Sequence, residues 1–174
     1  MSTISKKICL FGDFGVGKTS LIRQFVECQF SDEYLSTVGV KISRKLVYFP
    51  ETDPHFEQKL QLIIWDIEGS NKFKAVAKNY FQGSKGAVIV GDVTQAETLN
   101  HIQEHIQTFL AVNPNSYIVV ALNKSDMIAA EYLEKIRQMH QFTNQVNILD
   151  TYVTSAKTGN NVDKIFQALA TRLI

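Results

Sequence analysis

Short apolar, β-branched runs alternate with amphipathic segments along most of the chain, and this alternation limits the fold more than any other feature. Six strands are predicted, at residues 7–11, 45–49, 59–65, 86–92, 116–122 and 146–153. Helices are predicted from residue 19 to beyond residue 25, and at residues 96–112, 131–142 and 162–173. Strands that alternate with helices form right-handed crossovers between parallel neighbours. We therefore expect an α/β fold with a six-stranded, mostly parallel sheet and helices on both faces.

The connection between the second and third strands is different in kind. Its two prolines, Pro50 and Pro54, and its mixed charge predict a turn or loop, and hence a β-hairpin. We therefore expect one antiparallel edge strand. The chain of 174 residues shows no internal repeat, low-complexity tract or linker, so a single domain is expected over residues 1–174.

The charge balance excludes several classes of partner. Eighteen Lys and Arg residues against 17 Asp and Glu residues give a net charge of +1, which provides no basic field for nucleic acid. No apolar run approaches the roughly 18 residues needed to cross a bilayer. The first residues show no secretory signal pattern, and Cys9 and Cys28 are interpreted as reduced thiols. These features predict a cytoplasmic protein.

A glycine-rich motif follows the first strand and opens the first helix. The segment Gly12-Asp13-Phe14-Gly15-Val16-Gly17-Lys18-Thr19 matches the pattern G-x-x-x-x-G-K-[ST]. Its glycines let the backbone wrap phosphate groups closely, with N–H groups that point inward at a helix N-terminus. Lys18 supplies a charge to the β- and γ-phosphates, and the Thr19 hydroxyl can ligate Mg²⁺. The alternative is a glycine-rich turn without function, which the flanking strand and helix disfavour.

A second motif indicates which base the nucleotide carries. Asn123-Lys124-Ser125-Asp126 follows the fifth strand, in register with the phosphate-binding loop. The Asp126 carboxylate can accept from both N1–H and the 2-amino group of guanine, a paired donor edge that adenine lacks. Alone, the tetrapeptide could equally be a solvated turn, but its position after a strand favours guanine recognition. Thr154-Ser155-Ala156-Lys157 follows the last strand and is a weaker signal.

With these motifs in view, nearly the whole chain resembles the Ras superfamily of small GTPases, most closely the Rab branch. The resemblance is carried, in the family's order and at nearly its spacings, by Gly12 to Ser20, Thr37-Val38-Gly39, Trp65-Asp66-x-x-Gly69, Asn123 to Asp126 and Ser155-Ala156-Lys157. It implies the fold of a P-loop NTPase of the small G domain type. It also implies a switch that binds GTP or GDP with Mg²⁺ and hydrolyses GTP.

The resemblance implies roles for individual residues. Nucleotide contacts are implied for Asp13, Gly15, Val16, Gly17, Lys18, Thr19, Ser20, Phe30, Tyr34, Thr37, Gly69, Asn123, Lys124, Asp126, Ser155, Ala156 and Lys157. Among these, Phe30 and Lys124 would flank the guanine, Ala156 would offer its N–H to guanine O6, and Tyr34 would cover the nucleotide. Thr19, Thr37 and Asp66 would hold Mg²⁺. Catalytic roles are implied for Lys18, Thr37 and Gly69, where the Gly69 N–H would touch the γ-phosphate.

Three residues depart from the family's pattern near the γ-phosphate. Ser70 stands where the family's catalytic glutamine orients the attacking water, and its side chain is too short to reach that water. Phe14 replaces a small residue of the phosphate-binding loop; it either crowds an incoming arginine finger or turns outward onto the second switch. Glu68 stands in place of alanine and is either a solvated loop acid or a substitute catalytic residue. Weak hydrolysis is therefore expected.

Two functional hypotheses follow. The first is a nucleotide-controlled switch that recruits protein effectors, and possible exchange or activating factors, through its switch regions. The second is a GTP-bound interaction module that hardly hydrolyses. The interval from Thr37 to Asp66 is longer than is usual in the family, so the loop near residues 50–58 is expected to be a partner surface or a neutral insertion. No cysteine lies near the last residue, Ile174, so no lipid anchor is expected in this chain; a truncated protein, a member that never docks on membranes and a bacterial relative remain alternative explanations.

Overall fold

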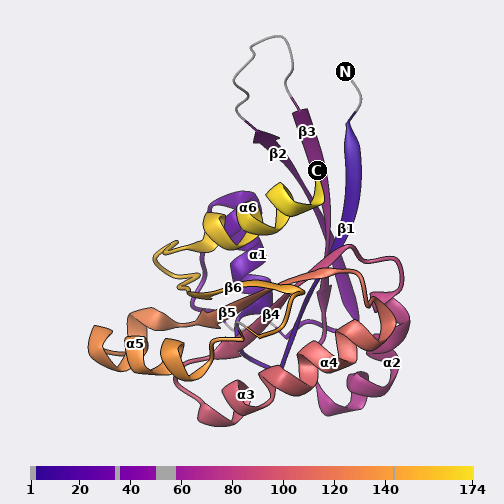
Figure 1. Cartoon of the computed structure of the whole chain (residues 1–174). Helices are drawn as coiled ribbons and strands as arrows, with labels where there is room; N and C mark the ends of the chain where they lie inside the picture. The colour runs from indigo at the N-terminus through magenta and orange to yellow at the C-terminus, as the bar shows by residue number, and fades with distance from the viewer. Residues whose placement is uncertain (1–2, 34–35, 50–57, 143) are drawn as a thin grey trace.

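A computed structural model describes residues 3–33, 36–49, 58–142 and 144–174. The described strands form one six-stranded sheet in the order β2-β3-β1-β4-β5-β6 (Figure 1). They are β1 (Ile4–Gly12), β2 (Val40–Phe49), β3 (Gln58–Ile67), β4 (Gly86–Asp92), β5 (Tyr117–Asn123) and β6 (Ile148–Val153). Among the described strands, β2 and β3 alone pair antiparallel, and the other neighbours are parallel. The predicted α/β fold, with its antiparallel edge strand, is confirmed.

Helices cover both faces of this sheet (Figure 1). They are α1 (Lys18–Glu27), α2 (Asn71–Phe81), α3 (Ala96–Asn100), α4 (Ile102–Val112), α5 (Ala130–Met139) and α6 (Val162–Leu173), with a short 3₁₀ turn at Ser125–Met127. The core on one face packs α1 and α6 against the sheet, and the core on the other face packs α2, α3, α4 and α5. Within the described residues, no helix is long and apolar enough to span a membrane.

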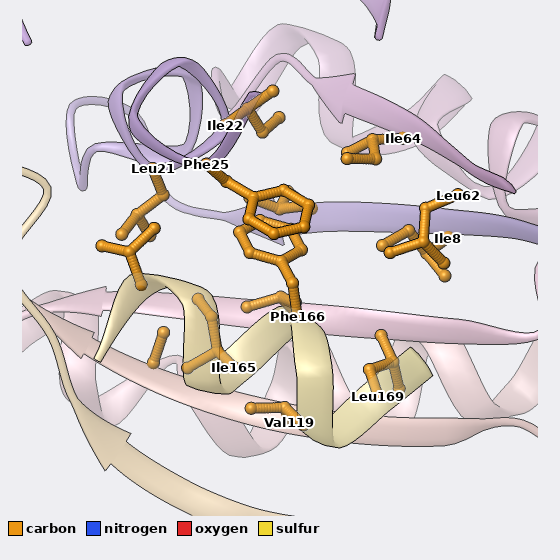
Figure 2. Close-up of a cluster of buried hydrophobic side chains, with 14 of the residues drawn as sticks. Ile8, Leu21, Ile22, Phe25, Leu62, Ile64, Val119, Ile165, Phe166 and Leu169 are labelled. Atoms are coloured by element: carbon orange, nitrogen blue, oxygen red, sulfur yellow. The ribbon is translucent and has the colours of Figure 1, made fainter. Parts of the chain in front are cut away.

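Alternation along the central strand β1 divides the core between the two faces. Ile8 and Leu10 face α1 and α6, whereas Cys9 and Phe11 face the opposite layer, as the two-residue period of a strand requires. On the first face, Phe25 of α1 and Phe166 of α6 stack with ring centroids 4.1 Å apart (Figure 2). Such aromatic pairs contribute about 0.5–1.5 kcal/mol beyond the area they bury. This contact fixes α1, and therefore the loop before it, relative to the sheet.

Besides shifts of one to three residues at the ends of other elements, the structure corrects the predicted elements in four places. The helix expected over residues 96–112 is divided at His101, where the sequence carries neither glycine nor proline to mark a break. Helix α2 was not predicted. Helix α5 ends at Met139, three residues early, because His140 leaves the helical conformation, with a φ of −114° and a ψ of 35°. Strand β2 begins at Val40, five residues early, because its half-exposed edge position gives a weak apolar pattern.

The β2–β3 hairpin extends away from the carboxyl end of β3. Val40 pairs with Ile67 beside that end, and Phe49 pairs with Gln58 at the opposite end. The loop of residues 50–57, expected to be a partner surface or a neutral insertion, lies outside the described residues. Opposite the Phe49–Gln58 end of the hairpin, the loops that follow β1, β3, β4, β5 and β6 lie at the carboxyl end of the parallel strands. In open α/β sheets that end binds ligands.

Candidate functional site

Two glycines, Gly17 in the loop after β1 and Gly69 in the loop after β3, allow close contacts between loops at positions that no other residue fits. Gly17 has a φ of 99°, and a Cβ there would lie 2.3 Å from the Asn123 side-chain nitrogen. Gly69, from the loop after β3, comes so close that its Cβ would lie 2.5 Å from the Asp13 carbonyl carbon. The three loops after β1, β3 and β5 therefore touch through glycine, and a larger residue at either position would push them apart.

Lys18 occupies the first turn of α1 beneath this loop. Its side chain is buried, and its ammonium donates to the carbonyl oxygens of Gly12 at 3.0 Å and Asp13 at 2.6 Å. Burial lowers the Lys18 pKa to about 8, although the nearby charges of Asp66, Asp13 and Glu68 oppose that shift. Among the described residues, no side chain caps the amino end of α1. Free helix N–H groups beside an ammonium make an anion site.

A hollow lies in front of these groups. Its lining includes Phe14, Gly15, Gly17, Lys18, Thr19, Ser20, Thr37, Glu68 and Gly69. A second hollow of about 320 Å³ continues beside it. The lining of the second includes Phe30, Asn123, Lys124, Asp126, Ala156 and Lys157. Most of the residues predicted to contact a nucleotide therefore line two adjoining spaces, one beside the anion site and one beside the loops after β5 and β6.

Three oxygen-bearing side chains meet at the carboxyl end of β3. The Thr19 hydroxyl lies 2.5 Å from Asp66 Oδ2 and 2.6 Å from the Thr37 hydroxyl. Among the described residues, the buried Asp66 Oδ1 has no hydrogen-bond partner, and burial raises the Asp66 pKa. Hydroxyl and carboxylate oxygens are the donors that Mg²⁺ takes. The three side chains therefore fit Mg²⁺, and the unpartnered carboxylate oxygen leaves a negative group for a cation to neutralise.

Asn123 joins the two hollows from behind. It is 1% exposed, and its amide nitrogen donates to the Val16 carbonyl at 3.0 Å. Its side-chain oxygen accepts from the Thr154 hydroxyl at 3.2 Å and from the Ala156 N–H at 3.3 Å. The family resemblance assigns the same Ala156 N–H to guanine O6. That N–H would therefore have to be shared between the Asn123 oxygen and the guanine.

Asp126 is held in place by its neighbour across the hollow. The buried Ser155 hydroxyl donates to Asp126 Oδ1 at 2.6 Å. Lys124 has a φ of 66°, and its ammonium lies 2.6 Å from Asp92 Oδ2. That contact is an ion pair at short distance, although its angles are not those of a hydrogen bond. The carboxylate predicted to read a base and the lysine predicted to flank it are thus both anchored from the protein side.

Sequence reasoning missed Asp92, and it named Thr154 only as part of the motif after the last strand, without a role in the site. Asp92 is fully buried at the end of β4, and its Oδ1 accepts from both the N–H and the hydroxyl of Thr94. The signal that could have identified Asp92 is its position, because it is a carboxylate at the end of an otherwise apolar strand. Asp66 has a similar position, one residue before the end of β3. Four predicted residues, Asp13, Val16, Asp66 and Ser155, lie behind the hollows and are not among the residues that line them. Tyr34 falls outside the described residues.

The departures from the family pattern gather around the first hollow. The Phe14 ring lines it and is 52% exposed. Glu68 accepts from the Gly39 N–H at 2.7 Å and from the Ser70 hydroxyl at 2.5 Å. These two hydrogen bonds, the Gly39 bond being the larger effect, lower the pKa of Glu68. Ser70 is therefore turned to Glu68, and Glu68 links the start of β2 to the loop after β3.

Comparison with known proteins agrees with this geometry. A sequence model described as the Ras family matches residues 7–174. The chain is 32% identical to Ras-related protein Rab5A of Oryza sativa, over 97% of this chain and 79% of the relative. It is 34% identical to Ras-related protein RABF2b of Arabidopsis thaliana, over 98% and 82%, and 29% identical to GTP-binding protein ypt4 of Schizosaccharomyces pombe, over 97% and 71%. With the fold, the phosphate-binding loop and these matches together, the chain belongs to the Ras family of small GTPases, close to its Rab members.

Proposed function

We propose that this chain is a single guanine-nucleotide-binding domain, over residues 1–174, that binds GTP and GDP with Mg²⁺ and works as a molecular switch. The observation that carries the proposal is the link between the two hollows. Asn123 ties the phosphate-binding loop at Val16 to Ala156, while Ser155 holds the Asp126 carboxylate beside them. Membership of the Ras family supports the same reading, and one relative is itself named a GTP-binding protein.

Guanine selectivity rests on Asp126. One carboxylate oxygen accepts from Ser155, which fixes the plane of the group. A carboxylate has about four acceptor sites, so enough remain for the N1–H and 2-amino donors of guanine. Adenine has no such donor pair, so a bound adenine would cover the exposed Asp126 carboxylate without pairing it, which is strongly discriminating. Phe30 and Lys124, which line the same hollow, would flank the base.

Phosphate binding rests on Lys18 and the amino end of α1. The ammonium would move from the carbonyls it now contacts to the β- and γ-phosphates, while the loop N–H groups hold the remaining oxygens. Thr19, Thr37 and Asp66 would hold Mg²⁺, which when bound neutralises charge on the phosphate oxygens. Thr37 and the Gly69 N–H would make their contacts only when the γ-phosphate is present. GTP and GDP would therefore order the two switch segments, one around Thr37 and one after Gly69, differently.

We further propose that hydrolysis is slow. The Ser70 hydroxyl is short and already donates to Glu68. Phe14 lines the hollow, where its ring would crowd an incoming arginine finger. The same observations favour the second candidate function, a GTP-bound interaction module that hardly hydrolyses. Glu68 remains a candidate for orienting water, because each of its oxygens accepts one hydrogen bond, from Gly39 or from Ser70, and can accept another.

Partners are proposed to be proteins that read the switch segments. Val38, next to Thr37, is 87% exposed, and Ile42 in β2 is 49% exposed. Exposed apolar side chains of this kind suit an effector, an exchange factor or an activating factor. The net charge of +1 gives no support to a nucleic-acid partner. A cytoplasmic location is part of the same proposal.

The test is the identity of the nucleotide that the purified protein carries. The protein is denatured, and the released nucleotide is identified by chromatography beside GDP, GTP, ADP and ATP standards. GDP supports the hydrolysing switch, and retained GTP supports the interaction module. A preparation that releases no guanine nucleotide, and then fails to bind added GDP with Mg²⁺, contradicts the proposal.

A further inference from the structure

Two histidines hold the side chain of a phosphate-loop residue. His101, between α3 and α4, brings its Nδ1 to 2.6 Å from Asp13 Oδ2. His105, on α4, brings its Nε2 to 2.9 Å from Asp13 Oδ1. His105 is only 2% exposed and lies edge-on against Phe11, with ring centroids 4.7 Å apart. Both oxygens of one carboxylate are therefore held from a helix some 90 residues away in the sequence.

The protonation of these groups follows from the geometry. Burial alone would raise the Asp13 pKa, but the hydrogen bonds and charges of His105 and His101 outweigh it and hold that pKa well below its usual range. Asp13 is therefore an ionised carboxylate, which can only accept hydrogen bonds. Each facing histidine nitrogen must then carry a proton. Such charge-assisted hydrogen bonds are roughly twice as strong as neutral ones.

The backbone of Asp13 reaches the other side of the loop. Its carbonyl accepts from the Lys18 ammonium at 2.6 Å, and Gly69 packs directly against that carbonyl. A shift of Asp13 would therefore move the resting place of Lys18 and the contact with the loop after β3.

We propose that His101 and His105 are positioning residues of the phosphate-binding loop. By holding the Asp13 carboxylate, they set the place of the Lys18 ammonium and thereby the grip on the β-phosphate. This inference rests on the proposed function, because it assumes that a guanine nucleotide binds there. According to this inference, residues at the start of α4 influence the affinity for phosphate through their contacts with Asp13.

The experiment compares two substitutions of His105 with wild type, each in the full chain with Mg²⁺. His105→Phe keeps a ring against Phe11 but removes the donor, whereas His105→Gln keeps an N–H donor near the position of Nε2. Affinities for GDP and for GMP are measured by competition. GMP lacks the β-phosphate that Lys18 contacts, so a positioning role affects GDP alone. Loss of one hydrogen bond to a charged group should weaken GDP by about tenfold or more.

The expected result is a loss of GDP affinity in His105→Phe, unchanged GMP affinity, and recovery of most of the loss in His105→Gln. Equal loss for GDP and GMP would show a merely structural role and overturn the inference, as would no loss for either. His101→Ala, at a partly exposed side chain, should give the same selective loss even where His105→Phe does not fold. His140→Gln, at the residue that follows α5, is the matched control and should leave both affinities unchanged. If the wild-type protein fails to bind GDP, the proposed function itself is contradicted.

Discussion

Replacing Asn123 by alanine tests the link that joins the two hollows. The substitution removes three hydrogen bonds and leaves a carbonyl at Val16, a hydroxyl at Thr154 and an N–H at Ala156 without their partner. All three residues are buried. A buried polar group left unpaired costs about 1–3 kcal/mol, so the three together should cost about 4 kcal/mol when partial repair by the rotating hydroxyl and by water is allowed for. That is a large part of the 5–15 kcal/mol that typically separates folded from unfolded protein.

The assay is urea and thermal unfolding of the protein without nucleotide. For a domain of this size, 4 kcal/mol corresponds to a fall in Tm of roughly 8–16 °C. Asn147→Ala is the matched control, because Asn147 donates to the Pro114 and Ser116 carbonyls in a half-buried place outside the site. It should cost less and leave GDP affinity unchanged. If Asn123→Ala lost no more stability than Asn147→Ala, Asn123 would not be the link described here.

Three further predictions concern the site and the core. Thr19→Asn removes the hydroxyl shared with the neighbouring oxygens, so GTP affinity should fall and lose its Mg²⁺ dependence in titrations with and without a chelator. Burial raises the Cys9 pKa to about 11, so at pH 8 a thiol reagent should modify only Cys28 until the protein is unfolded. Since the ordinary thiol pKa is 9.0, the stability that a protonated Cys9 contributes is complete below that pH and should be lost as the pH rises toward 11, seen as a falling urea midpoint. Single-turnover hydrolysis of GTP should be slower than the order of 10⁻⁴ s⁻¹ known for relatives without an activating partner. The double substitution Phe14→Gly with Ser70→Gln should raise the rate by more than the two single substitutions combined. Additive effects would mean that Phe14 lies away from the γ-phosphate.

The site that the sequence predicts rests on local signals. A glycine loop between a strand and a helix, and a short polar motif after a later strand, each carry their chemistry within eight residues. The parallel sheet then brings the carboxyl ends of its strands to one edge, so motifs far apart in the chain must meet. For this reason the sequence alone predicts that Lys18, Thr19 and Asp126 belong to one site.

Contacts between distant segments could not be predicted. The link from Glu68 to Gly39 joins residues 29 positions apart, and no pattern in either segment requires it. The pairing of Asp13 with His101 depends on a break between α3 and α4 that no glycine or proline announces. Helix α2 was overlooked although Ala77 and Phe81, four residues apart, are both buried on one face of it.

The central claim is guanine recognition by Asp126, and competition between guanine and adenine nucleotides tests it most directly. Wild-type protein, loaded with a fluorescent GDP analogue and Mg²⁺, is titrated with GDP, GTP, ADP and ATP. GDP and GTP should displace the analogue at far lower concentrations than ADP or ATP, by a factor on the order of 10⁴ for a lost paired contact. Asp126→Asn should abolish that preference without unfolding the protein. Displacement by ATP as readily as by GTP, or an unchanged preference in Asp126→Asn, would contradict the account.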